Sequence, residues 1–184
     1  MSTGTGAVLG HRTIEADLRK YIRIGGSGVL AARVSGFKSG GEAPELWYFG
    51  GNMELRGYPY LSFVGNEGFF ANLELRIPII DVMATPIGLL GPVRGTLYGG
   101  IGGAKLRGQD WQFSTSDPGI SYVRDPVLGE AVNGLRLVDG RASYGMGLQF
   151  FFLGYPMHFD WSKLTDLNVV SPGWKFDFWI GYDF

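Results

Sequence analysis

The sequence predicts an all-β protein, namely an antiparallel, up-and-down transmembrane β-barrel of about eight strands. Three observations lead to this fold class. Apolar and polar residues alternate over long stretches, the connections between these stretches are alternately short and long, and the composition is rich in glycine (31 of 184 residues) and in aromatic residues (15%). Alternation with a period of two is typical of a strand whose two faces meet different surroundings.

Seven segments show this alternation. The N-terminal pair, residues 13–25 and 28–37, is separated by a short glycine-rich turn, which is typical of a β-hairpin. The segment at residues 68–80 is the most regular, because its odd positions are apolar whereas Glu74 and Arg76 share the opposite face. The other four segments are residues 93–103, 142–152, 157–164 and 172–184.

Alternation alone does not identify the face that meets water, because a soluble barrel also alternates, with its apolar face inward. Here the polar faces carry few charges, and the apolar faces carry bulky aromatic residues near the strand ends, as in the girdles of membrane barrels. The long connections, residues 38–67, 104–141 and 164–173, fall at one end of the strands, as in outer-membrane barrels. We therefore expect lipid or detergent around the apolar faces. A soluble β-barrel that binds an apolar ligand is the alternative.

Composition argues against several other classes of protein. A net charge of −1 provides no basic surface for nucleic acid. With no cysteine and two histidines, the sequence offers neither a disulfide framework nor a thiol nucleophile, and we expect no metal site and no cofactor. No apolar stretch approaches the roughly 20 residues of a membrane helix, and the first ten residues lack the features of a signal peptide.

His158, Asp160 and Ser162 share one face of a predicted strand and are the residue types of a hydrolase. Successive residues on one face of a strand stand about 6.5–7 Å apart. This separation is too large for the hydrogen bond of about 3 Å between a nucleophile and its base. We therefore expect that the protein is not an enzyme.

One long connection carries a motif. In the stretch YFGGNMELRGYPYLSFVGNEGFFANLELRIPI, a Leu-Arg-Gly-Tyr sequence with Arg56, Gly57 and Tyr58 follows a pair of glycines and precedes a strand with Glu-Leu-Arg-x-Pro. This combination resembles the barrel region of the BamA/TamA-like outer-membrane assembly factors, also called the bacterial surface antigen family. Members of that family share a loop of this kind ahead of such a strand.

The end of the chain agrees with this resemblance, which extends over residues 11–184. Family members finish in a strand with a glycine three residues before a terminal aromatic residue. The sequence IGYDF places Gly181 and Phe184 in those positions, with Tyr182 between them. These three residues are expected to form the C-terminal strand signal. The whole of residues 172–184 is expected to be a strand with Phe184 on its lipid-facing side.

The resemblance implies roles for particular side chains. It implies that Arg56 turns back into the barrel lumen and pairs with Glu74 on the wall. Glu74 and Arg76 lie two residues apart on one face, so a local ion-pair network that holds the lumen together is an alternative role for them, compatible with the first. Relatives carry an acid in the following strand, where this chain has Gly100. The resemblance also implies a location in the bacterial outer membrane. The implied function is insertion and folding of other outer-membrane proteins, which would be the partners.

Size sets the remaining alternatives. The family barrel has about sixteen strands and additional recruitment modules, so residues 1–184 are expected to be a single domain that covers its C-terminal half. We expect a fragment or minimal barrel, completed by the N-terminal segment and with little activity alone. One alternative is a homodimer whose two chains share sixteen strands, and another is a structural or pore-forming small barrel. An eight-stranded barrel is filled by its own side chains, so the Arg56 loop would not fit inside it.

Overall fold

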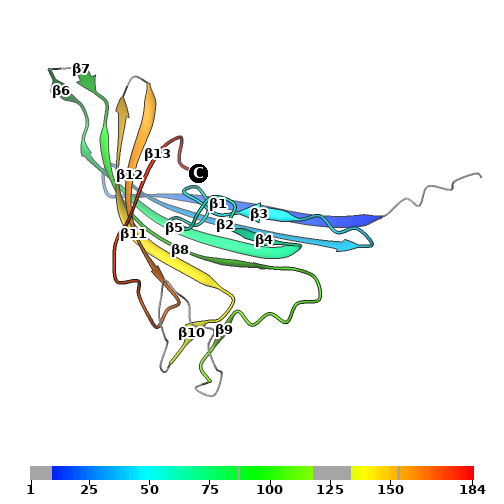
Figure 1. Ribbon diagram of the computed structural model, residues 1–184. Helices are drawn as coiled ribbons and strands as arrows, with labels where there is room; N and C mark the ends of the chain where they lie inside the picture. Colours follow the sequence, from blue (N-terminus) through cyan, green and yellow to red (C-terminus); the bar gives the residue numbers. More distant parts are fainter. Residues whose placement is uncertain (1–9, 87, 118–133, 153) are drawn as a thin grey trace, which may run out of the picture.

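The computed structural model describes residues 10–86, 88–117, 134–152 and 154–184, which form an all-β structure (Figure 1). Seven long strands make one antiparallel sheet, in which each long strand pairs with the next one along the chain. They are β1 (His11–Ile24), β2 (Gly28–Gly41), β5 (Glu67–Ile80), β8 (Val93–Lys105), β11 (Arg141–Phe152), β12 (Tyr155–Thr165) and β13 (Lys175–Ile180). Each alternating segment of the sequence corresponds to one of these strands, which confirms the predicted all-β, antiparallel organisation. No helix long and apolar enough to cross a membrane occurs among the residues that the structure describes.

Three two-stranded sheets lie in the connections between the long strands. They are formed by β3 (Trp47–Phe49) with β4 (Phe63–Gly65), β6 (Met83–Thr85) with β7 (Gly88–Leu90), and β9 (Ser114–Thr115) with β10 (Arg136–Leu137). The β6–β7 hairpin extends from one end of the curved main sheet, and β9 and β10 extend from another part of its rim (Figure 1). The β3–β4 pair brackets the loop that carries the Leu-Arg-Gly-Tyr motif.

The main sheet is open in the described part of the chain, and β1 and β13 form its two edges. It therefore has seven strands instead of the predicted eight. The segment expected to supply an eighth strand, residues 1–9, lies outside the described residues. Successive antiparallel strands reverse direction, so the first and seventh strands run the same way. An antiparallel closure needs an even number of strands.

The two faces of the sheet differ in polarity and in exposure. Leu18 and Ile180 are 70% and 56% exposed, whereas Glu74 and Asp160 are each only 2% exposed. Apolar side chains therefore cover an exposed face, called the outer face below. Polar and charged side chains lie on the opposite, inner face, and beneath the loop between β3 and β4 they are buried.

The last strand ends earlier than the sequence suggested. The ladder between β12 and β13 stops at the pair Met157 and Ile180. The Gly181 N–H still donates to the Pro156 carbonyl at 3.1 Å, but proline has no N–H to donate in return. The Gly181 carbonyl instead accepts a hydrogen bond from the His158 ring at 2.8 Å.

Residues 181–184 consequently lie over the inner face, and the prediction that Phe184 faces outward was wrong. Phe184 is 5% exposed, whereas Tyr182 is 68% exposed. The Phe184 ring packs against the guanidinium groups of Arg33 and Arg76, at 5.7 and 5.1 Å. An Arg76 N–H also donates to the Phe184 backbone oxygen at 3.3 Å. These contacts join the end of the chain, which follows one edge strand, to β2 and β5 near the other edge.

Candidate functional site

The loop between β3 and β4 contains glycines at three backbone positions with positive φ angles. Gly50, Gly51 and Gly57 all have positive φ angles, of 127°, 94° and 86°, a region that side-chain-bearing residues rarely adopt. Gly57 also lies against β12, where an added Cβ would come within 2.8 Å of the Ser162 Cβ. The glycine of the Leu-Arg-Gly-Tyr motif is therefore required both by its φ angle and by close packing.

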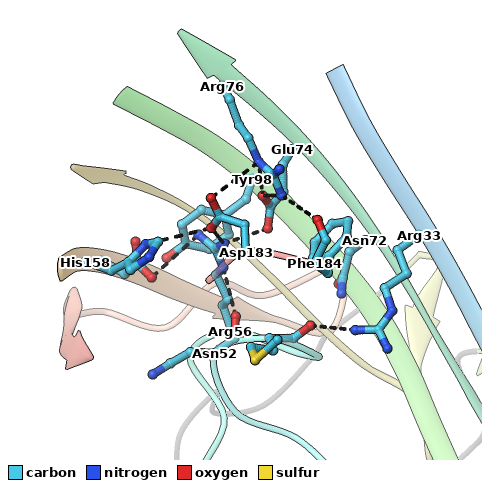
Figure 2. Close-up of polar contacts among 12 residues, drawn as sticks. Arg33, Asn52, Arg56, Asn72, Glu74, Arg76, Tyr98, His158, Asp183 and Phe184 are labelled. Atoms are coloured by element: carbon cyan, nitrogen blue, oxygen red, sulfur yellow. Dashed lines mark hydrogen bonds and ion pairs between the residues drawn. The ribbon is translucent and has the colours of Figure 1, made fainter. Parts of the chain in front are cut away.

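Arg56 projects from this loop onto the inner face and is 6% exposed. Its guanidinium donates to the Glu74 carboxylate at 2.7 Å and lies 3.5 Å from a carboxylate oxygen of Asp183 (Figure 2). It also lies 3.5 Å from a carboxylate oxygen of Asp160. The Arg56 Nε donates to the Asn52 carbonyl at 3.0 Å. Three carboxylates from β5, β12 and the C-terminal residues thus converge on one arginine.

Glu74 joins two arginines. Its second oxygen accepts hydrogen bonds from Arg76 Nε and Nη2 at 2.9 and 2.7 Å. Arg76 also lies 3.9 Å from Asp183. The structure therefore brings together Arg56 and Glu74, which the resemblance implied, and Arg76, which shares a strand face with Glu74, and it adds Asp160 and Asp183 to the same network. A buried charged network of this kind is favourable only when every member is paired.

Sequence reasoning did not assign Asp160 and Asp183 as partners of Arg56. Alternation placed both residues on the polar face, but the pattern does not identify the loop residue that they meet. The structure also explains why Gly100 carries no acid. A Cβ at position 100 would lie 2.5 Å from the Asn72 side-chain oxygen and 2.9 Å from Leu55 Cδ1, so this position accommodates the loop and leaves no room for a carboxylate.

The loop is attached to strands on both sides of the sheet. On the β1 side, Arg33 of β2 donates to the Met53 carbonyl at 3.1 Å, and Asn72 of β5 donates to the Glu54 carbonyl. On the other side, the Tyr58 hydroxyl donates to the Ala142 carbonyl of β11 at 3.2 Å. A second attachment on that side is the hydrogen bond that the Lys175 ammonium of β13 donates to the Gly57 carbonyl of the loop at 2.8 Å. With Arg56 bound to Asp160 of β12, the loop contacts β2, β5, β11, β12 and β13.

The residues with hydrolase character have other contacts. The His158 ring stacks on Trp179 with centroids 3.6 Å apart, and Trp179 donates its ring N–H to Asp160 at 2.7 Å. The Ser162 hydroxyl pairs with the Tyr98 hydroxyl at 2.7 Å. Within the described residues, no group of three or more histidines and acids is arranged to hold a metal ion.

Glu54 is the loop carboxylate with a perturbed proton affinity. Burial raises the pKa of Glu54 above its usual value of 4.5, and a hydrogen bond from the Gly50 N–H at 2.6 Å opposes this rise. Desolvation disfavours the charged form of a carboxyl group, whereas a donated N–H favours it. Glu54, which accepts the Gly50 N–H within the loop, therefore has a higher pKa in the folded chain than in the unfolded chain.

A scan against models of known protein families and a search of curated proteins found no match. The resemblance to the bacterial surface antigen family is accordingly based on the quoted motifs alone. Gly181 lies at the end of the β12–β13 ladder, Tyr182 is exposed and Phe184 is packed on the inner face. The three residues of the expected C-terminal signal thus lie in different surroundings.

Proposed function

We propose that this chain forms part of the wall of a β-barrel in the bacterial outer membrane and takes part in the insertion of other outer-membrane proteins. The observation that carries the membrane location is the burial pattern. Exposed apolar side chains lie on the outer face of six of the seven long strands: examples are Ile14, Leu18, Val34, Leu73, Ile77, Leu97, Met146, Leu148, Phe176, Phe178 and Ile180. Lipid is the surrounding that makes such a face favourable.

The inner face supports a filled interior in preference to a pore. Arg56 and Glu74 are buried there, and Leu55 of the loop and the terminal Phe184 pack against the sheet. A soluble barrel with a ligand cavity would need the apolar face inside, which is the reverse of the observed arrangement. The burial pattern therefore favours a membrane barrel with a filled interior over a pore-forming barrel and over a soluble, ligand-binding barrel.

The free edges support the insertion function. An unpaired edge strand presents a row of N–H and C=O groups, and a membrane supplies no other partner for them. An incoming strand can satisfy these groups by adding to the edge. β13 is the more weakly held edge, because only six residue pairs join it to β12, whereas fourteen residue pairs join the other edge strand, β1, to β2.

The membrane part is tested by the detergent requirement of the purified chain. We expect β-structure by circular dichroism only in detergent or lipid vesicles. Folded, monodisperse protein in detergent-free buffer would contradict the membrane location.

The insertion part has a separate test. Liposomes containing the chain should fold an added, urea-unfolded outer-membrane barrel protein faster than liposomes containing an unrelated barrel whose sheet is closed. Equal folding rates in the two kinds of liposome would rule out the insertion function and would leave the membrane location intact.

A further inference from the structure

A row of charged side chains crosses the outer face where β2, β5 and β8 meet the long connections. Lys38 pairs in register with Glu67, which pairs with Lys105 on the next strand. The Lys38 ammonium lies 3.1 Å from one Glu67 oxygen, and the Lys105 ammonium lies 3.6 Å from the other. Because side chains alternate along a strand, these residues share the face of Val34, Leu73 and Leu97. Two cations therefore flank one carboxylate at the rim of the apolar surface.

The row borders a cleft of about 310 Å³, called the rim cleft below. Its charged lining residues are Lys38, Lys105, Arg107 and Glu67, and the rest of the lining includes three glycines. The Arg107 guanidinium donates to the Gly41 carbonyl, which holds it beside the cleft. Three cations and one carboxylate leave an excess of positive charge in a cleft with little side-chain obstruction.

The opposite rim of the same three strands has a different character. The outer-face positions there are apolar, among them Leu30 in β2, Ile77 and Ile79 in β5, and Val93 in β8. The outer face of β2, β5 and β8 is therefore cationic at one rim only, the rim next to the long connections.

We propose that the rim cleft binds the phosphate group of an anionic lipid whose acyl chains lie along the adjacent outer face. This proposal rests on the proposed membrane location. Cationic side chains at the border of an apolar surface lie at headgroup depth, where lysine stems cover apolar surface and their ammonium groups meet phosphate. In the absence of lipid, Glu67 holds the two ammonium groups in place. When lipid binds, the phosphate becomes their partner and competes with the Glu67 carboxylate.

The test uses the purified chain in a neutral detergent, with lipid adducts counted by native mass spectrometry. The probes are phosphatidylglycerol, zwitterionic phosphatidylcholine and inorganic phosphate. We expect phosphatidylglycerol to bind at least tenfold more tightly than phosphatidylcholine. The double variant Lys38→Gln/Lys105→Gln should lose this preference. Glu67→Gln should bind phosphatidylglycerol several-fold more tightly, because the competing carboxylate is gone.

A charge-matched control is Arg23→Gln/Arg94→Gln, which removes two exposed cations that do not line the rim cleft. This control should keep the lipid preference. If both double variants lost the preference for phosphatidylglycerol equally, net charge alone would explain the preference and the proposal would be wrong. A folded Glu67→Gln variant that bound phosphatidylglycerol more weakly than the wild type would also overturn the proposal. Inorganic phosphate that displaces the lipid at equal concentration would identify a free anion as the ligand. The proposed membrane location has its own test, because a chain that folds in detergent-free buffer would contradict that location whatever the lipid measurements show.

Discussion

At the scale of single residues, the polar interactions of the inner face are centred on Arg56. Its guanidinium contacts Glu74, Asp160 and Asp183 and lies 4.6 Å from the centre of the Tyr98 ring. A planar guanidinium with five donors can serve several carboxylates at once, which an ammonium group cannot do with the same geometry. Removing this one side chain therefore leaves several buried acids without their shared partner.

Arg56→Ala is expected to lower the free energy of unfolding by about 3–5 kcal/mol, the usual loss when one partner of a buried ion pair is removed. Urea unfolding in lipid vesicles, or the temperature at which the folded band disappears on a gel, measures the change. Arg56→Lys should recover only part of the loss. Arg23→Ala, which removes an exposed arginine from β1, is the control and should unfold like the wild type. An Arg56→Ala protein as stable as this control would show that the buried network contributes nothing.

Gly57→Ala is expected to be more destabilising than Gly108→Ala. Both glycines have φ near +85°, at 86° and 83°, so both substitutions carry a similar backbone cost of about 1–2 kcal/mol. An added Cβ at Gly57 meets Ser162 and Leu164 within 3 Å, whereas one at Gly108 meets nothing within 4 Å. We therefore expect the free energy of unfolding of Gly57→Ala to be lower than that of Gly108→Ala by about 1–3 kcal/mol, the usual cost of overpacking. Urea unfolding of the two variants measures this difference. Equal values would mean that the loop does not pack on β12.

Glu54 gives the loop a pH dependence with a defined sign. Because the pKa of Glu54 is raised above 4.5 in the folded state, the folded chain binds more protons than the unfolded chain between the two pKa values. Its contribution to stability is therefore complete below pH 4.5 and is lost as the pH rises through the folded pKa. The urea midpoint of Glu54→Gln should fall less than that of the wild type between pH 4.5 and 8. If the urea midpoint of Glu54→Gln fell more than that of the wild type over this pH range, the pKa of Glu54 would not be raised by folding and the prediction would be wrong.

At the scale of elements, the C-terminal residues act as an internal contact of the sheet. They leave the edge of β13 at Gly181 and reach Arg33 of β2 and Arg76 of β5 through Phe184. With the loop between β3 and β4, they give the inner face two connections that do not depend on pairing between strands. The curvature of the open sheet is therefore supported from within.

Phe184→Ala is expected to destabilise the protein by about 3 kcal/mol, as for other buried phenylalanines, while Tyr182→Ala should change stability little, because Tyr182 is exposed. Thermal unfolding of both variants in the same detergent gives the comparison. If Phe184 faced outward as the alternation alone suggests, the two substitutions would have similar effects. The ranking of the two variants therefore decides between the two positions of the terminal ring.

These elements indicate how far the sequence could be interpreted. Alternation located all seven long strands, because a two-faced strand imposes its period on every residue. The contact between Arg56 and Glu74 was anticipated only through the family resemblance of the motif, because alternation does not identify the loop residue that an inner-face acid meets. The inward course of residues 181–184 was missed because it depends on Pro156 of the neighbouring strand, which cannot return a hydrogen bond to Gly181. The sequence shows Pro156, but it does not show that this proline lies opposite Gly181, because that depends on the register between β12 and β13.

At the scale of the whole molecule, two features disfavour closure of the seven strands on themselves. β1 and β13 run in the same direction, so they could meet only as a parallel pair. The interior is also occupied, because an eight-stranded barrel is wide enough only for its own side chains, and this inner face holds the loop with Arg56 in addition. A cleft of about 570 Å³, lined by residues of β1, β2, the loop and β13, remains between the two edges. We therefore expect that strands other than these seven complete the barrel proposed above.

Engineered cysteines test this conclusion cleanly, since the chain has none of its own. Leu18 in β1 and Phe178 in β13 are exposed edge-strand residues, and we expect no intramolecular disulfide in the oxidised Leu18→Cys/Phe178→Cys variant. Leu18→Cys/Val34→Cys is the positive control, because these residues are register partners in β1 and β2 and lie at a separation typical of a bridge. Mobility on non-reducing gels, in lipid vesicles, distinguishes the products. A cross-linked monomer of the first variant would show that the seven strands close alone, whereas a cross-linked dimer would identify a second copy as the source of the missing strands.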